Sequence, residues 1–289
     1  MPAYVLVGAK GAPGVTTAAA ALAAVATTGG RSIFVELDPS GGSVSVLTGQ
    51  PAVVGLVEAA GLLRRTTSAA AIDDNATMTP HGIATLLAPN SGPVTESVIG
   101  SIGERWMTAL RTAALDVVVD GGRWEPGQST ARRIVGADLT VIVVRATVAS
   151  IESTRHIVDR VREATKRPAA ALVVGTKPYR PEEVASHLDL PMAGALAWDP
   201  RGAGTLWAAG VSRGWTRTLL ARSAAQVWAN LFDIASPPPS ALPSGQSQAQ
   251  PQHYSSGEHG APPPGPAHMA GSAAQHPYNQ PVQPEVPRL

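Results

Sequence analysis

The segment from residue 8 to residue 17 has the residue types of a phosphate-binding loop. It reads GAKGAPGVTT and lies between an apolar run, Tyr4–Gly8, and an alanine-rich stretch, Thr16–Thr28. Gly11 and Gly14 allow tight turns that bring backbone N–H groups close to an anion. A helix after the loop would add the positive end of its dipole. The pattern predicts a phosphate site, and the alternative is a strand-to-helix turn without a ligand.

Two hydroxyls and two carboxylates could complete such a site. Thr16 is placed to ligate Mg²⁺, and Thr17 to reach an α-phosphate. Asp38 and Asp120 each follow an apolar run where a strand would end. Such strand ends meet at one edge of an open α/β sheet, where ligands bind. A carboxylate at Asp120 suits a water of a Mg²⁺ shell, whereas the alternative for each Asp is a turn residue after a strand.

The order of the apolar runs indicates an α/β fold. Strands are expected at Tyr4–Gly8, Arg31–Leu37, Ile83–Leu87, Leu115–Val119, Leu139–Val144 and Ala170–Val174. Helices are expected at Thr16–Thr28, Ile99–Ala114, Ser150–Thr165, Glu182–Leu188 and 217–233. Because nearly continuous apolar strands alternate with helices, we predict a mostly parallel twisted sheet with helices on both faces.

Composition limits the remaining classes of function. The 289 residues include no cysteine, which excludes disulfides and cysteine nucleophiles. The formal net charge of +1 does not demand nucleic acid or an anionic membrane as a partner.

The composition of the chain changes at residue 236. From there it is rich in Pro, Gly, Ser, Gln and His. Such a segment buries too little apolar surface to fold. We predict one domain over residues 1–235 and a disordered tail over 236–289, either inert or a docking segment for a partner protein.

The sequence has no apolar run of about 18 residues or more that could span a membrane. A cytoplasmic protein is the expectation, with peripheral attachment to the membrane or a cell pole as the alternative. Residues 217–233 could form an amphipathic anchor, although a final core helix is the simpler interpretation. The side chains compatible with one face of this helix are Leu219, Leu220, Val227, Leu231 and Phe232.

Two short basic pairs are the basis for a weak nucleic-acid hypothesis. Arg64-Arg65 and Arg132-Arg133 could contact DNA without sequence specificity. A solvated surface is the alternative for both pairs, and no DNA-reading motif accompanies them.

The phosphate loop resembles the deviant Walker A motif, KGGxGKTT, of the MinD/ParA family of dimerising ATPases. Lys10 falls on the signature lysine of that motif, and Thr16 and Thr17 fall on its two threonines. The resemblance implies an ATP–Mg²⁺ site and a nucleotide-dependent homodimer, in which Lys10 acts in catalysis by reaching the partner's phosphates. The cofactor-binding residues that it implies are Lys10, Gly11, Ala12, Pro13, Gly14, Val15, Thr16, Thr17 and Pro200.

The loop also departs from this motif. Val15 occupies the place of the ordinary phosphate-loop lysine, so a cation is missing there. Since a hydrogen bond to a charged group contributes about 1.5–3 kcal/mol, affinity would fall about tenfold or more. Pro13 removes one backbone N–H, and Ala12 replaces a glycine. We therefore expect nucleotide binding with weak or absent hydrolysis.

Two further segments extend the resemblance. The run VELDPSGG, from residue 35 to residue 42, is similar to the DxDPQG segment of the family, with Glu36 in place of its first Asp. This similarity implies that Asp38 orients the attacking water and senses the γ-phosphate. Asp116, Asp120 and the two glycines after Asp120 are similar to the YDxxxxDxxPG segment. Asp120 is then the Walker B residue and, with Thr16, belongs to the Mg²⁺ site.

The base-binding part of the site is less well marked. The family has an Asn after the strand that corresponds to Ala170–Val174, whereas this chain reads GTKPY. Trp198-Asp199-Pro200 falls where a loop beside the base would be. The family resemblance alone favours adenine, and Trp198 is either a base contact or a packing residue.

Two functions from different classes follow. The first is an ATP-binding, dimeric positioning or partitioning factor, and the second is a pseudo-ATPase scaffold that localises pilus, secretion or division machinery through protein contacts. A metabolic P-loop enzyme is a weaker third hypothesis, because no further acid, base or nucleophile accompanies the loop.

Overall fold

The predicted α/β architecture is confirmed by the computed structural model, which describes residues 2–11, 13–50, 55–103, 105–113, 115–125, 136–165, 167–208 and 212–235. Within these ranges one sheet has the strand order β3-β4-β2-β5-β1-β6-β7-β8, and every neighbouring pair is parallel except β3 with β4. The strands are β1 Ala3–Gly8, β2 Ser32–Glu36, β3 Thr77–Thr79, β4 Ile83–Leu86, β5 Asp116–Arg123, β6 Leu139–Arg145, β7 Ala169–Val174 and β8 Met192–Leu196.

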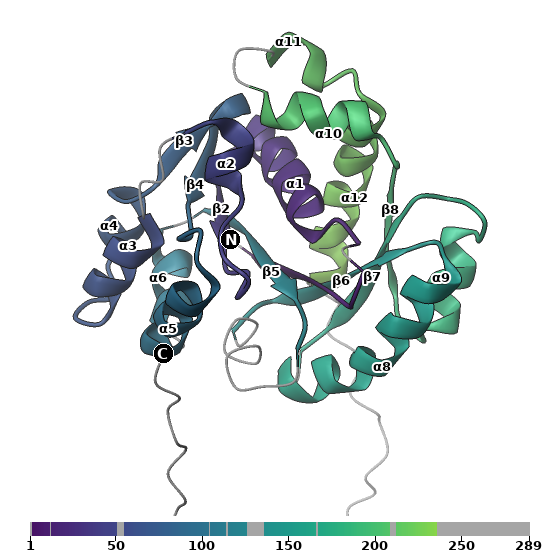
Figure 1. Cartoon of the computed structure of the whole chain (residues 1–289), viewed down its shortest axis with the longest axis horizontal. Helices are drawn as coiled ribbons and strands as arrows, with labels where there is room; N and C mark the ends of the chain where they lie inside the picture. The colour runs from purple at the N-terminus through teal and green to yellow at the C-terminus, as the bar shows by residue number, and fades with distance from the viewer. Residues whose placement is uncertain are drawn as a thin grey trace, which may run out of the picture. The chain divides into compact units, whose positions relative to one another are not determined.

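Helices cover both faces of this sheet, as Figure 1 shows. They are α1 Val15–Gly29, α2 Val44–Thr48, α3 Gly55–Leu63, α4 Ala70–Asp73, α5 Gly92–Ile102, α6 Arg105–Thr112, α8 Val148–Thr165, α9 Pro181–His187, α10 Pro200–Trp207, α11 Ser212–Trp215 and α12 Leu219–Ala235, together with a 3₁₀ turn at Pro80–Gly82. None of the described helices is long and apolar enough to cross a membrane.

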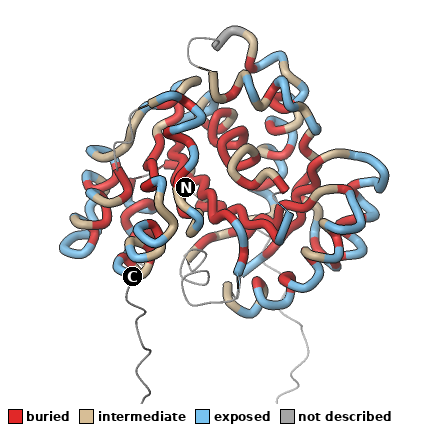
Figure 2. The backbone as a smooth tube through the Cα atoms, in the orientation of Figure 1, coloured by how far each residue is buried: buried red, intermediate tan, exposed pale blue. Residues whose placement is uncertain are grey.

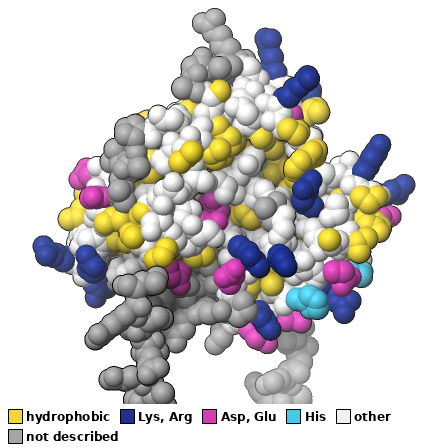
Figure 3. Space-filling view, in the orientation of Figure 1, with side chains coloured by type: hydrophobic (Ala, Val, Ile, Leu, Met, Phe, Trp, Pro, Cys, Tyr) yellow, Lys and Arg dark blue, Asp and Glu magenta, His cyan; other side chains and the backbone are white. Residues whose placement is uncertain are grey.

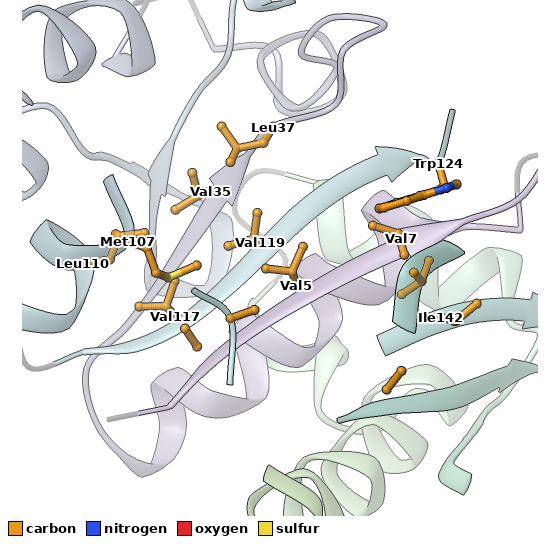
Figure 4. Packing of buried hydrophobic residues seen from close by; sticks show 14 of the residues in the cluster. Val5, Val7, Val35, Leu37, Met107, Leu110, Val117, Val119, Trp124 and Ile142 are labelled. Atoms are coloured by element: carbon orange, nitrogen blue, oxygen red, sulfur yellow. The ribbon is translucent and has the colours of Figure 1, made fainter. Parts of the chain in front are cut away.

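Each face of the sheet has its own hydrophobic core. One core joins alternate strand residues to α3, α5, α6, α8 and α9, and Figure 4 shows part of it around Val5, Val119 and Met107. The other core joins the opposite strand residues to α1, α10 and α12. The central strands and α1 are buried along most of their length (Figure 2). This two-sided burial explains why the strands are nearly continuous apolar runs.

Helix α1 lies at the centre of the second core. Its residues 18–24 are all buried, and all but Leu22 are alanine. Small side chains let the helix axis approach β5 and α12 closely. The N-terminus of α1 is therefore fixed beside the carboxyl ends of β1 and β5, where the phosphate loop begins.

One predicted helix was wrong. The stretch Ile99–Ala114 was expected to be continuous, but the structure has α5 ending at Ile102 and α6 beginning at Arg105. Gly103 has φ of 59°, a left-handed conformation that stops a helix. The apolar periodicity continues across this break, so it could not indicate where the chain turns.

The final helix is a core helix, as the simpler interpretation predicted. Helix α12 packs on α1 and β8 and buries Leu220, Val227 and Leu231. The expectation that Leu219 and Phe232 share that face was wrong, because their side chains are 56% and 59% exposed. The predicted tail and the pair Arg132-Arg133 lie outside the described residues.

Candidate nucleotide site

The phosphate loop connects β1 to α1, as the sequence predicted. Gly11 and Gly14 have φ of 102° and 95°, which favours glycine at both positions. A Cβ at either position would meet nothing within 4 Å, so the backbone there is open. The residue at the N-terminus of α1 is Gly14, which has no side chain with which to cap the helix. The N–H groups of the first turn are therefore suited to bind an anion. Ala12 lies outside the described residues.

The side chains of Pro13 and Val15 pack against the end of β1. A Cβ at Gly8 would lie 2.6 Å from Pro13 Cγ and 2.7 Å from Val15 Cγ2, so only glycine fits there. Val15 is only 7% exposed. Its side chain packs against Gly8 at the end of β1 and points away from solvent. Val15 would therefore contact a phosphate through its backbone N–H.

Asp120 lies within β5, which continues to Arg123 and does not end at Val119 as expected, and its carboxyl group accepts a hydrogen bond from Thr16. Asp120 is buried, and its Oδ1 accepts a hydrogen bond of 3.0 Å from Gly122 N. The pKa of Asp120 is raised to about 7, mainly by burial and to a smaller extent by the nearby charges of Asp38 and Glu36, while hydrogen bonds from Thr16 and Gly122 oppose the rise. A hydroxyl and a carboxylate of this kind fit Mg²⁺, which prefers oxygen ligands and retains several waters.

Asp38 lies beside this pair. Its Oδ1 accepts a hydrogen bond of 2.8 Å from Ser40 N, which fixes the turn after β2. Its carboxyl group also packs so closely on Gly122 that a Cβ there would collide with it. The φ of Gly122 is 63°, again in the left-handed region. The turn and this glycine together hold Asp38 next to Asp120, as the sequence predicted for strand ends at one edge.

Glu36 has a structural role that sequence reasoning did not identify. It is buried, and its Oε1 accepts hydrogen bonds from Ser43 N and Val44 N at 2.9 and 3.0 Å. Its Oε2 accepts a bond of 3.1 Å from Ala88 N. The carboxyl group thus joins the end of β2 to the start of α2 and to the segment after β4. Burial raises its pKa despite these bonds.

A cavity of about 330 Å³ adjoins the loop. It lies beside the first turn of α1 and reaches the loop that precedes α10. Its lining includes Pro13, Gly14, Thr17, Val174, Trp198 and Pro200. The volume and the mixture of apolar walls with a loop of backbone N–H groups suit a nucleoside. Thr17 and Pro200, two of the residues expected to bind the cofactor, therefore line one cavity.

Trp198 does not pack in the core. Its side chain is 56% exposed, and the Arg145 guanidinium lies 3.9 Å from the ring centroid. Arg145 also lines a second cavity of about 420 Å³ with Thr147, Thr176 and Lys177. Sequence reasoning missed Arg145, although a polar residue at the end of the apolar run Leu139–Val144 was the available signal. Lys10 is exposed in the loop.

Comparisons with known proteins identify the fold. No family model and no curated protein sequence matches the chain. Solved structures do match, and those described below are 14–15% identical to this chain, so the likeness concerns the fold. The chain has the fold of the MinD and ParA ATPases.

Three of these structures illustrate the match. A ParA-family ATPase from Chlorobium tepidum has a TM-score of 0.63 and 14% identity, over 79% of this chain and 98% of that one. Cyanothece McdA in complex with ATP has a TM-score of 0.59 and 15% identity, over 80% and 96%. MinD from Pyrococcus horikoshii with Mg-ADP has a TM-score of 0.57 and 14% identity, over 81% and 98%.

Proposed function

We propose that the protein binds ATP with Mg²⁺ and acts as a nucleotide-dependent dimeric positioning or partitioning factor. The observation that carries this proposal is the meeting of Thr16, Asp120 and Asp38 beside an uncapped helix N-terminus. Structures of the same fold that hold ATP or Mg-ADP support it. Through the same likeness, adenine is the proposed base, in the cavity that Pro200 and Trp198 line.

Each residue has a role in this proposal. The N–H groups of the loop and of the first turn of α1 hold the phosphates, and Thr16 and Asp120 hold Mg²⁺ directly or through water. When bound, Mg²⁺ neutralises charge on the phosphate oxygens. Asp38 orients the water that attacks the γ-phosphate, and Lys10 reaches the phosphates held by the second subunit. Binding of ATP would thereby favour the dimer.

Self-association tests this function. Sedimentation of the purified protein should give a dimer with Mg²⁺–ATP and a monomer with Mg²⁺–ADP. Lys10→Ala should stay monomeric with ATP while it keeps binding the nucleotide, because Lys10 acts across the interface. A wild-type protein that stays monomeric at saturating ATP would contradict the proposal.

A second candidate is the non-hydrolysing scaffold that localises pilus, secretion or division machinery. It is favoured because position 15 is a valine whose side chain, with that of Pro13, packs on Gly8. The loop therefore has no lysine at this position to assist hydrolysis. Phosphate release separates the two candidates. Release by the native protein that is lost in Asp38→Ala supports turnover, whereas release that appears only in Val15→Lys supports the scaffold.

The cellular role follows from the same proposal. We expect a cytoplasmic protein that recruits a partner protein, with residues 236–289 as the candidate docking segment. Attachment to the membrane or a cell pole, or non-specific contact with DNA, would then come through that partner or through the dimer surface. Tagged full-length protein and a variant that ends at Ala235 should differ in the partners that they retain.

A further inference from the structure

An irregularity in β5 places Arg123 on the same face of the sheet as Gly8, where the phosphate loop begins. Leu6 pairs with Asp120 and Gly8 pairs with Arg123, so β5 has one more residue than β1 over this interval. An extra residue of this kind inverts the alternation of side chains along the strand. Without it, Arg123 would share the face of Val117 and Val119, which pack in the core with α5 and α6.

The packing around this bulge confirms the inversion. Trp124, not Arg123, continues the face of Val119, and it lies near Val7 in Figure 4. The N–H of Trp124 donates a hydrogen bond of 2.7 Å to the Gly8 carbonyl. Paired residues of parallel strands point to the same face, so Arg123 shares the face of Gly8. On that face a Cβ at Gly8 would touch Pro13 and Val15 of the phosphate loop.

The charge at this edge explains why a cation is needed there. Glu36 is paired with Asp120 in the register of β2 and β5, and the Asp38 carboxyl group packs against Gly122, two residues after Asp120. A polyphosphate adds further negative charge, and Val15 provides none of the compensation that a lysine would give. In Figure 3 acidic and basic side chains lie next to each other near the middle of the visible face.

Among the described residues, the side-chain partner of Arg123 is one that a phosphate could replace. Its partner is Glu125, with Arg123 Nη1 and Glu125 Oε1 3.4 Å apart, and the two side chains are 49% and 57% exposed. An exposed ion pair of this kind is weak and readily exchanged for a stronger partner. Arginine also binds phosphate oxygens through two parallel N–H bonds.

We infer that Arg123 replaces the missing phosphate-loop lysine and binds the β- and γ-phosphates of the nucleotide. This inference rests on the proposed function, because it assumes that the loop holds a nucleotide. It assigns to Arg123 a direct contact with the ligand, and to Glu125 the role of a counter-ion that the phosphates displace.

Calorimetric titration with Mg²⁺–ATP tests this inference. Arg123→Ala should weaken ATP binding about tenfold or more, and Arg123→Lys should retain part of the affinity. Glu125→Gln should strengthen binding, because the arginine is released. The matched control is Arg31→Ala, since Arg31 is also an exposed arginine in a surface ion pair, with Asp73 at 3.4 Å. Asp116 N bonds to the Arg31 carbonyl at the start of β5, far from the loop.

The result for Arg123→Ala and the result for the wild type test different claims, the role of Arg123 and the binding of ATP. If wild type binds ATP and Arg123→Ala binds it equally well, the inference is overturned and the proposed function stands. If wild type does not bind ATP, the proposed function is overturned, and this inference with it.

An exchange of cations gives a second test. Val15→Lys should restore affinity to Arg123→Ala and add much less to the wild type, because one cation then replaces the other. An equal gain in ATP affinity in the wild type and in Arg123→Ala would show that positions 15 and 123 act independently. This result would overturn the inference that Arg123 replaces the missing lysine. Since Val15 is buried, the thermal transition of each Val15→Lys variant should first be compared with that of its parent.

Discussion

Asp120 is a buried carboxyl group in the candidate nucleotide site. It is 1% exposed, beside two other carboxyl groups, and burial raises its pKa to about 7. A carboxyl group in this state costs folding energy whenever it is ionised. In the proposed function, the ionised Asp120 carboxylate binds Mg²⁺. The bound ion would offset the free-energy cost of burying this negative charge.

Because the buried Asp120 carboxylate destabilises the metal-free protein when it is ionised, the effect of Asp120→Asn on thermal stability should depend on pH. Between an unfolded pKa of about 3.9 and the folded value near 7, the folded protein binds the extra proton, so the wild type loses stability as pH rises through this window. Asp120→Asn should therefore raise the midpoint of thermal unfolding in EDTA at pH 8, and raise it less at pH 5. Because one pKa unit equals about 1.4 kcal/mol, the change with pH should be a few kcal/mol at most.

The control is Asp73→Asn, because Asp73 is an exposed carboxylate in a surface ion pair. It should show little change at either pH. An Asp120→Asn variant that is less stable than wild type by the same amount at both pH values would contradict a raised pKa at this position.

At the scale of elements, Asp199 joins two helices near the nucleoside cavity. Its Oδ1 accepts a bond of 2.8 Å from Gly202 N in α10, and its Oδ2 accepts bonds of 3.0 and 3.2 Å from Leu219 N and Leu220 N of α12. These bonds satisfy N–H groups at the starts of both helices. Asp199 therefore fixes the loop that carries Trp198 and Pro200.

Asp199→Ala should destabilise the fold by about 1–2 kcal/mol, the usual cost of losing a helix cap. The bond from Gly202, followed by those from α12, lowers the pKa of Asp199. Its contribution should therefore be complete above about pH 4 and be lost as pH falls through the lowered value. Denaturant unfolding at pH 7 and at pH 3 checks this, with the exposed Asp159→Ala as the control. Equal losses at both pH values would contradict the capping role.

The sequence predicted those elements that have strong apolar periodicity. Strands β1, β2, β5, β6 and β7 lie within one to four residues of their expected bounds, because each is buried on both faces. It did not predict β8, whose residues MAGAL include no β-branched side chain. The short helices α2, α3 and α4 were also missed, since four to nine residues are too few for a clear helical period.

Within the site, sequence reasoning found residues with a local motif and missed those placed by tertiary contacts. Thr16 was found because it follows the glycine-rich loop, and Asp38 and Asp120 were found because each follows an apolar run. The structural role of Glu36 depends on N–H groups seven to 52 residues away. The direction of Arg123 depends on the pairing of β5 with β1. Neither relation has a signature along the chain.

At the scale of the whole molecule, the described residues between 2 and 235 contain an eight-stranded sheet and both of its cores. A variant that ends at Ala235 should therefore unfold within about 2 °C of the full chain, which corresponds to less than about 1 kcal/mol. Calorimetric melting of both proteins checks this. A markedly lower midpoint for the shorter variant would show that residues 236–289 stabilise the domain.

The measurement that tests the central claim most directly is calorimetric titration of Mg²⁺–ATP into wild type, Thr16→Ala and Thr28→Ala. Thr28 is a control at the other end of α1, where its hydroxyl donates a hydrogen bond to the Val25 carbonyl. Wild type and Thr28→Ala should bind alike, and Thr16→Ala should bind about tenfold more weakly or worse. No binding by wild type at millimolar ATP, or equal binding by all three proteins, would contradict a nucleotide site at this loop.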